Sequence, residues 1–130
     1  MRVALLGGGT ISRLLLEHGR QPGIPGVQFV AIAGRNAASR GAALSREFGI
    51  PHVVGREALL GLRPDAVVEA ASHDAVREHL VALLEAGVGV VVLSAGALAD
   101  DKLRLAAERA AGRSGACMMV PSGEIGRAHV

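Results

Sequence analysis

A short apolar run that ends in three consecutive glycines constrains the fold of this chain more than any other stretch. Apolar residues at positions 3–6 are followed by Gly7, Gly8 and Gly9, and a leucine-rich segment comes next. This order predicts a strand, a tight turn and a helix. Gly7, Gly9 and Ser12 occupy the small-residue positions of the pattern G-x-G-x-x-G. The turn therefore matches a pattern that binds phosphate groups.

Each small residue of this pattern has its own physical role. Gly7 lets the chain leave the strand sharply, Gly9 lets the backbone approach a pyrophosphate, and the third position allows the helix to pack closely on the strand. Ser12 departs from the usual glycine or alanine there and weakens the match. The first helical residues, Thr10 and Ile11, supply backbone amides and the positive end of the helix dipole, which favour a bound anion.

Alternating strands and helices follow along the chain. Runs of apolar residues predict strands at 2–6, 27–33, 51–54, 66–69, 88–93 and 116–120. Helical spacing and capping residues predict helices at 10–18, 36–48 with Asn36 as the cap, 56–60, 73–86 and 100–111. This pattern predicts one α/β domain, a doubly wound parallel sheet of the Rossmann type with strand order 3-2-1-4-5-6.

Composition narrows the class of protein further. Half of the 130 residues are apolar, but there are two Phe and no Trp or Tyr, so the core must be aliphatic, as in parallel sheets covered by helices. The 14 basic and 12 acidic residues are spread along the chain, which argues against a nucleic-acid partner. With a lone cysteine, no signal peptide and no run long enough to span a membrane, we expect a cytoplasmic protein.

The context of the glycine turn favours dinucleotide binding. The turn follows an expected strand, opens an expected helix and heads a full set of alternating units. The alternative is a similar sheet that binds another nucleotide-containing ligand, or none.

The end of the second expected strand bears on the type of cofactor. NAD-binding domains usually place a carboxylate there, about 20 residues beyond the glycines, to accept hydrogen bonds from the ribose. This chain has Arg35 and Asn36 instead. Arg35 could pair with a 2′-phosphate, with Asn36, Ser39 or Arg40 adding donors. We therefore expect NADP to be favoured over NAD, although a solvated Arg35 would be compatible with either cofactor.

Two further turns lie where ligands of such sheets bind, beyond the carboxyl ends of the strands. The candidate residues there, small apart from the histidine, are Ala71, Ser72, His73, Ser94, Ala95 and Gly96. They leave room for a nicotinamide ribose and ring. His73 directly follows a helix cap, which is typical of an exposed first-turn residue rather than of a catalytic acid or base.

The remaining histidines and the cysteine suggest no further chemistry. His18, His52 and His79 are not clustered with cysteines or carboxylates at the spacing of metal ligands, so no metal site is expected. Cys117 falls in an expected strand, and we expect it to be buried and inert.

Four stretches of the chain resemble the L-aspartate dehydrogenase family. They are Val3 to Ile11, Asp65 to Val76, Leu93 to Asp100 and Pro121 to Gly123, of which the third, Ser-x-Gly-Ala-Leu-Ala-Asp after an apolar strand, is the most distinctive. The resemblance implies a homodimeric enzyme that oxidatively deaminates L-aspartate to iminoaspartate with NAD or NADP and supplies NAD biosynthesis. In that family a second domain carries the catalytic histidine, so we expect residues 1–123 to bind cofactor without a catalytic residue.

The last seven residues look foreign to that family. Residues 124–130 are what GAG ATC GGA AGA GCA CAC GTC encodes, a string that resembles a widely used short-read sequencing adapter. This suggests a truncated reading frame whose native part ends near Gly123, without the catalytic domain. Two alternatives remain open from the sequence: the cofactor domain of another amino-acid or sugar oxidoreductase, and a non-catalytic nucleotide-binding module.

Overall fold

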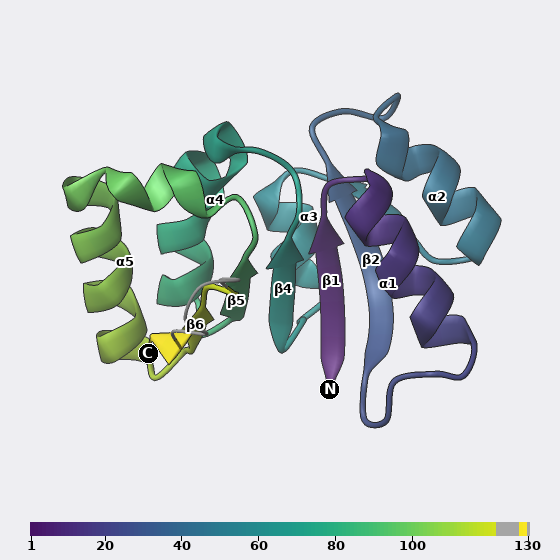
Figure 1. Cartoon of the computed structure of the whole chain (residues 1–130). Helices are drawn as coiled ribbons and strands as arrows, with labels where there is room; N and C mark the ends of the chain where they lie inside the picture. Colours follow the sequence, from purple (N-terminus) through teal and green to yellow (C-terminus); the bar gives the residue numbers. More distant parts are fainter. Residues whose placement is uncertain (122–127, 130) are drawn as a thin grey trace.

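An open sheet of parallel strands forms the centre of the computed structural model, which describes residues 1–121 and 128–129. Six parallel strands pair in the order β3-β2-β1-β4-β5-β6 (Figure 1). The strands are β1 (Arg2–Leu6), β2 (Gln28–Gly34), β3 (His52–Val54), β4 (Ala66–Glu69), β5 (Gly89–Val92) and β6 (Met118–Met119). The predicted doubly wound sheet and its strand order are confirmed. At the edge, β7 (Ala128–His129) pairs antiparallel with β6.

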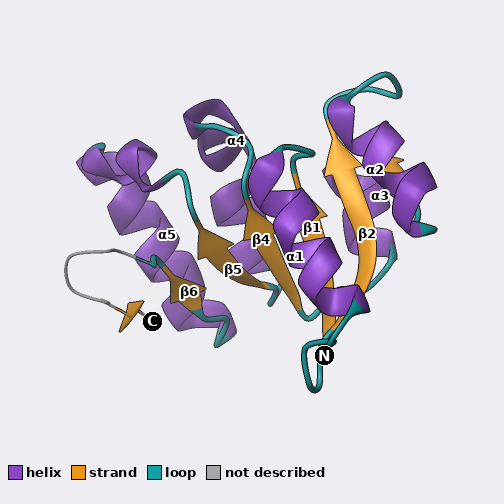
Figure 2. Ribbon diagram, turned by 45° about the vertical axis from the view of Figure 1, so that its right-hand side comes forward, coloured by secondary structure: helices purple, strands orange, loops and turns teal. Residues whose placement is uncertain are grey.

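Helices cover both faces of this sheet (Figures 1 and 2). They are α1 (Thr10–Arg20), α2 (Arg40–Phe48), α3 (Arg56–Gly61), α4 (His73–Glu85), the 3-10 helix η1 (Ala95–Ala99) and α5 (Asp101–Ser114). On one face Leu5 and Ile32 pack with Leu16 of α1 and Leu44 of α2. Alternate strand residues such as Leu6 point to the other face and pack with α3, α4 and α5.

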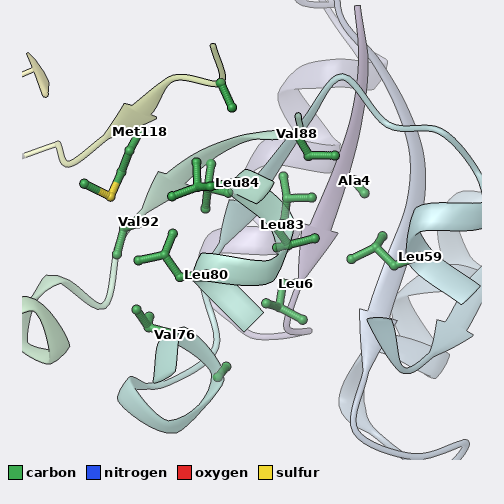
Figure 3. Packing of buried hydrophobic residues seen from close by; sticks show 14 of the residues in the cluster. Ala4, Leu6, Leu59, Val76, Leu80, Leu83, Leu84, Val88, Val92 and Met118 are labelled. Carbon is green, nitrogen blue, oxygen red and sulfur yellow. The ribbon is translucent and has the colours of Figure 1, made fainter. Parts of the chain in front are cut away.

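The larger of the two cores is built around α4. Leu80, Leu83 and Leu84 are almost fully buried and lie among side chains of the strands (Figure 3). Ser72 begins this helix, because its Oγ accepts a hydrogen bond from the amide of Ala75 at 3.1 Å. The helix predicted at 73–86 and the cap predicted before His73 are confirmed.

Two local expectations are wrong, each for an identifiable reason. The helix predicted from Asn36 begins at Arg40, because the Oδ1 of Asn36 accepts from the amide of Ala38 at 2.9 Å and forms a turn of its own. Cys117 is exposed rather than buried, because the alternation of a strand turns Met118 into the core and its neighbours outward. The other expected boundaries differ by a few residues.

The expected foreign tail, residues 124–130, lies outside the described residues except for positions 128 and 129. Among the helices of the described part of the chain, none combines the length and apolar character that crossing a membrane requires.

Replacing Leu84, which is fully buried, by alanine should lower the free energy of unfolding by about 2 to 5 kcal/mol, because it removes buried methyl groups and leaves a cavity. Urea denaturation followed by circular dichroism measures this change. The matched control is Leu105→Ala on α5, where the side chain is 42% exposed and the loss should be well under half as large. Equal losses in the two variants would contradict the core described above.

Candidate functional site

A cavity of about 460 Å³ opens at the carboxyl ends of β1, β2 and β4. This edge, next to the switch in strand order between β1 and β4, is where ligands of doubly wound sheets bind. The lining residues come from the glycine turn, the end of β2, the start of α3 and the first half of α4: Leu6, Gly7, Gly8, Ala33, Gly34, Arg35, Ser39, Arg40, Gly55, Arg56, Leu59, Ala70, Ala71, Ser72, Ala75, Glu78 and His79.

The backbone at Gly7 lies between the end of β2 and the loop that follows β4. Its amide donates to the carbonyl of Ala33 at 3.0 Å, and its φ of +107° lies in the region that favours glycine. A Cβ built on Gly7 would lie 2.8 Å from the carbonyl oxygen of Ala70. A side chain is therefore excluded here both by conformation and by the loop that follows β4.

Gly8 and Gly9 bring the turn against the start of α2. A Cβ on Gly8 would collide with the backbone of Gly41 and Arg40, so the two segments touch without any side chain between them. A Cβ on Gly9 would lie 3.6 Å from Nη2 of Arg40, which places that guanidinium beside the turn. Bare backbone next to a cation fits the pyrophosphate of a dinucleotide.

The start of α1 presents backbone amides rather than side chains. Gly9 is the N-cap, and no described side chain caps this end of the helix. Thr10 and Ile11 are exposed in its first turn, whereas Ser12 is fully buried and its Oγ donates to the carbonyl of Gly7 at 2.7 Å. The serine that weakens the sequence pattern thus binds the turn itself.

The segment from the end of β2 to the start of α2 supplies two of the cavity's arginines. Arg35 is exposed and lines the cavity together with Arg40. The hydroxyl of Ser39 is already hydrogen-bonded to Nε2 of His52 at 2.8 Å, and Asn36 is absent from the lining. The two guanidinium groups are therefore the main polar features at this end of β2.

The far wall of the cavity contains a polar pair that the sequence did not reveal. Nη1 of Arg56 donates to the carbonyl of Glu78 at 2.9 Å and lies 3.1 Å from Nδ1 of His79. Because arginine only donates, Nδ1 must accept, and the ring proton of neutral His79 is on Nε2. Burial lowers the pKa of His79; the Glu78 carboxylate, 3.7 Å from Nε2, opposes this effect and the Arg56 charge adds to it.

The loops after β4 and β5 meet at His73 and Gly96, two residues that are absent from the cavity lining. A Cβ on Gly96 would lie 2.6 Å from Cε1 of His73, so the loops after β4 and β5 are in contact. His73 is exposed, as expected. Of the residues chosen from the sequence, six line the cavity: Gly7, Arg35, Ser39, Arg40, Ala71 and Ser72. The others are absent from its lining: Gly9, Thr10, Ile11, Ser12, Asn36, His73, Ser94, Ala95 and Gly96.

A metal site finds no support in the part of the chain that the structure describes. No three His, Cys, Asp or Glu side chains among those residues gather closely enough to hold a metal ion.

The fold, the glycine turn and the cavity define a dinucleotide-binding domain. Residues 7–121 match the family model described as the NAD binding domain of homoserine dehydrogenase, and the chain belongs to that family. The cofactor of the domain is thus a nicotinamide dinucleotide.

Curated relatives extend this result. The chain is 41% identical over 128 residues to L-aspartate dehydrogenase 2 of Bordetella bronchiseptica, covering 95% of this chain and 45% of that protein. It is 40% identical over 127 residues to L-aspartate dehydrogenase 1 of Bordetella pertussis, covering 96% of this chain and 46% of that protein. The resemblance to L-aspartate dehydrogenases is confirmed, and the chain spans about half the length of these relatives.

Solved structures of oxidoreductases share the fold. KijD10, a 3-ketoreductase from Actinomadura kijaniata in complex with NADP and TDP-benzene, is 25% identical with a TM-score of 0.76, over 92% of this chain and 36% of that chain. The WlbA dehydrogenase from Chromobacterium violaceum, in complex with NADH and UDP-GlcNAcA, is 16% identical with a TM-score of 0.79, over 92% and 34% of the two chains.

Gly8→Ala should destabilise the domain by about 1 to 3 kcal/mol, because the new methyl group overlaps the backbone of Gly41. Chemical denaturation gives this loss. The control is Gly112→Ala in α5, where a Cβ has open space and alanine should stabilise the helix by about 0.5 to 1 kcal/mol. A Gly8→Ala variant as stable as the unaltered chain would contradict the close contact.

His79 should make stability depend on pH in a defined window. Because its pKa is lowered from 6.5 in the folded protein, the unfolded chain takes up a proton first as the pH falls. This contribution is complete above about pH 6.5 and is lost as the pH falls through the folded pKa. His79→Asn keeps an acceptor for Arg56 but does not titrate, so its unfolding free energy should fall less between about pH 7.5 and about pH 5.5. The unfolding free energies of the unaltered chain and of His79→Asn come from urea titrations at each pH. An equal fall in both over this pH range would refute the prediction.

Proposed function

We propose that the chain is the cofactor-binding part of an L-aspartate dehydrogenase. The whole enzyme would oxidise L-aspartate to iminoaspartate: a hydride leaves the α-carbon for the nicotinamide of NAD(P), and the amino nitrogen releases a proton. The observation that carries this proposal is the identity of about 40% to such enzymes over nearly the whole chain. The enzyme would be a cytoplasmic homodimer that acts in NAD biosynthesis.

Within that enzyme the residues of this chain bind and orient the cofactor. The turn Gly7 to Ser12 and the amides of α1 hold the pyrophosphate, while Arg35 and Asn36 face the adenosine ribose. The loops after β4 and β5 hold the nicotinamide end through Ala71, Ser72, His73, Ser94, Ala95 and Gly96. We assign residues 1–123 to this domain, the acid–base chemistry to a second domain of the parent protein, and a non-native origin to residues 124–130.

Arginine at the end of β2 supports a preference for NADP over NAD. Arg35 and Arg40 both line the cavity, and no described carboxylate lies at the end of β2 to accept from a ribose 2′-hydroxyl. A guanidinium can bind a 2′-phosphate through two parallel hydrogen bonds.

A second candidate function is that of a sugar oxidoreductase, favoured by the fold shared with KijD10 and WlbA. Their identity to this chain, 25% and 16%, is well below that of the L-aspartate dehydrogenases. A non-catalytic nucleotide-binding module is the remaining alternative. Activity of the complete gene product with L-aspartate, compared with nucleotide sugars, separates these candidates.

Arg35→Ala should weaken NADPH binding about 10- to 100-fold, because a charge-assisted pair with the 2′-phosphate is worth about 1.5 to 3 kcal/mol. The Kd for NADH, which lacks that phosphate, should change far less. Isothermal titration calorimetry with both cofactors gives the ratio.

Arg109→Ala on the exposed side of α5 is the matched control, since it removes the same charge far from the cavity. If the unaltered chain binds NADH alone, the proposed role of Arg35 is wrong. If it binds neither cofactor, the proposal of a cofactor domain fails.

A further inference from the structure

A buried carboxylate at the end of β4 joins the two loops that border the nicotinamide side of the site. Glu69 is 2% exposed. Its Oε2 accepts from the amides of Ala71 at 2.9 Å and Ser72 at 3.1 Å and from the hydroxyl of Ser94 at 2.7 Å. Its Oε1 accepts from the amides of Leu93 at 3.1 Å and Ser94 at 2.8 Å. One side chain thus holds the loop after β4 and the loop after β5.

Both oxygens of the Glu69 side chain act as hydrogen-bond acceptors. All the groups that face the carboxylate are donors, and an ionised carboxylate accepts at both oxygens. Burying such a charge is costly unless it is hydrogen-bonded, and here five hydrogen bonds from neutral donors satisfy it. Within the described residues, Glu69 makes no salt bridge, so the two loops replace the counter-ion that a buried acid usually has.

The position of Glu69 separates it from direct contact with a ligand. It is absent from the cavity lining, whereas Ala71 and Ser72, which it holds, line the cavity. Further out, His73 and Gly96 touch across the same two loops. The carboxylate therefore lies behind the two loops and acts on a ligand only through their positions.

We propose that Glu69 is a positioning residue for the nicotinamide half of the cofactor. Its carboxylate fixes the distance between the loops after β4 and β5, so that the nicotinamide ribose and ring meet a gap of constant width. The adenosine half is held by Arg35, Arg40 and the wall of α3, which Glu69 does not touch. This inference rests on the proposed binding of the cofactor across both halves of the site.

Glu69→Gln tests this role with almost no change in shape. Whichever way the amide is oriented, its NH₂ group faces amides that also donate, so one of the two loops loses its acceptor. The ligands are NADPH and 2′-phospho-ADP-ribose, which lacks the nicotinamide, with NADH and ADP-ribose as a parallel pair. Titration calorimetry on the 130-residue chain gives the four Kd values.

We expect Glu69→Gln to weaken NADPH and NADH about tenfold or more, while the two truncated ligands change by less than about twofold. Amide hydrogen exchange at Leu93, Ser94, Ala71 and Ser72 should become faster. The control Glu85→Gln removes the same charge from an exposed ion pair with Arg113 and should leave all four Kd values unchanged. Equal weakening of full and truncated ligands, or no weakening, would overturn the proposal.

A milder variant keeps the test valid if Glu69→Gln fails to fold. Ser94→Ala removes one donor to Oε2 and leaves the other four in place. It should weaken NADPH by about two- to threefold and leave 2′-phospho-ADP-ribose unaffected; an equal effect on both ligands would overturn the proposal. Failure of the unaltered chain to bind any ligand would instead overturn cofactor binding itself.

Discussion

The contact between bare backbones at the glycine turn is the constraint on which the rest of this domain depends. Gly7 packs against the carbonyl of Ala70, and Gly8 packs against Gly41 at the start of α2. Three segments that are distant in sequence therefore meet at a point where no side chain fits. Their meeting places the ends of β1, β2 and β4 around one cavity, which Gly7 and Gly8 help to line.

Local sequence patterns were sufficient to predict the sheet, its strand order and the glycine turn. Alternating apolar runs and breakers fix which segments become strands, and the connections between parallel strands leave few possible orders. Boundaries were harder to predict where a side chain competes with the helix, as Asn36 does ahead of α2. The exposure of Cys117 follows from the alternation of side chains at β6, which turns Met118 inward and Cys117 outward.

The unpredicted parts of the site come from contacts between residues far apart in the chain. Arg56 and His79 are 23 residues apart, and Glu69 and Ser94 are 25 residues apart. No spacing rule connects such pairs, because their meeting depends on how α3, α4 and the strands pack. A glutamate at the end of an otherwise apolar strand was the one visible signal, since an acid there needs buried donors.

Ser12 gives the glycine turn a hydrogen bond that a third glycine could not make. Its hydroxyl donates a hydrogen bond to the carbonyl oxygen of Gly7 at 2.7 Å, and the side chain is buried. The turn is thereby ordered before any ligand arrives, and its loss of conformational entropy belongs to folding rather than to binding. If the proposed site holds the pyrophosphate there, cofactor exchange at this turn should proceed by rigid docking, without a loop that must first close.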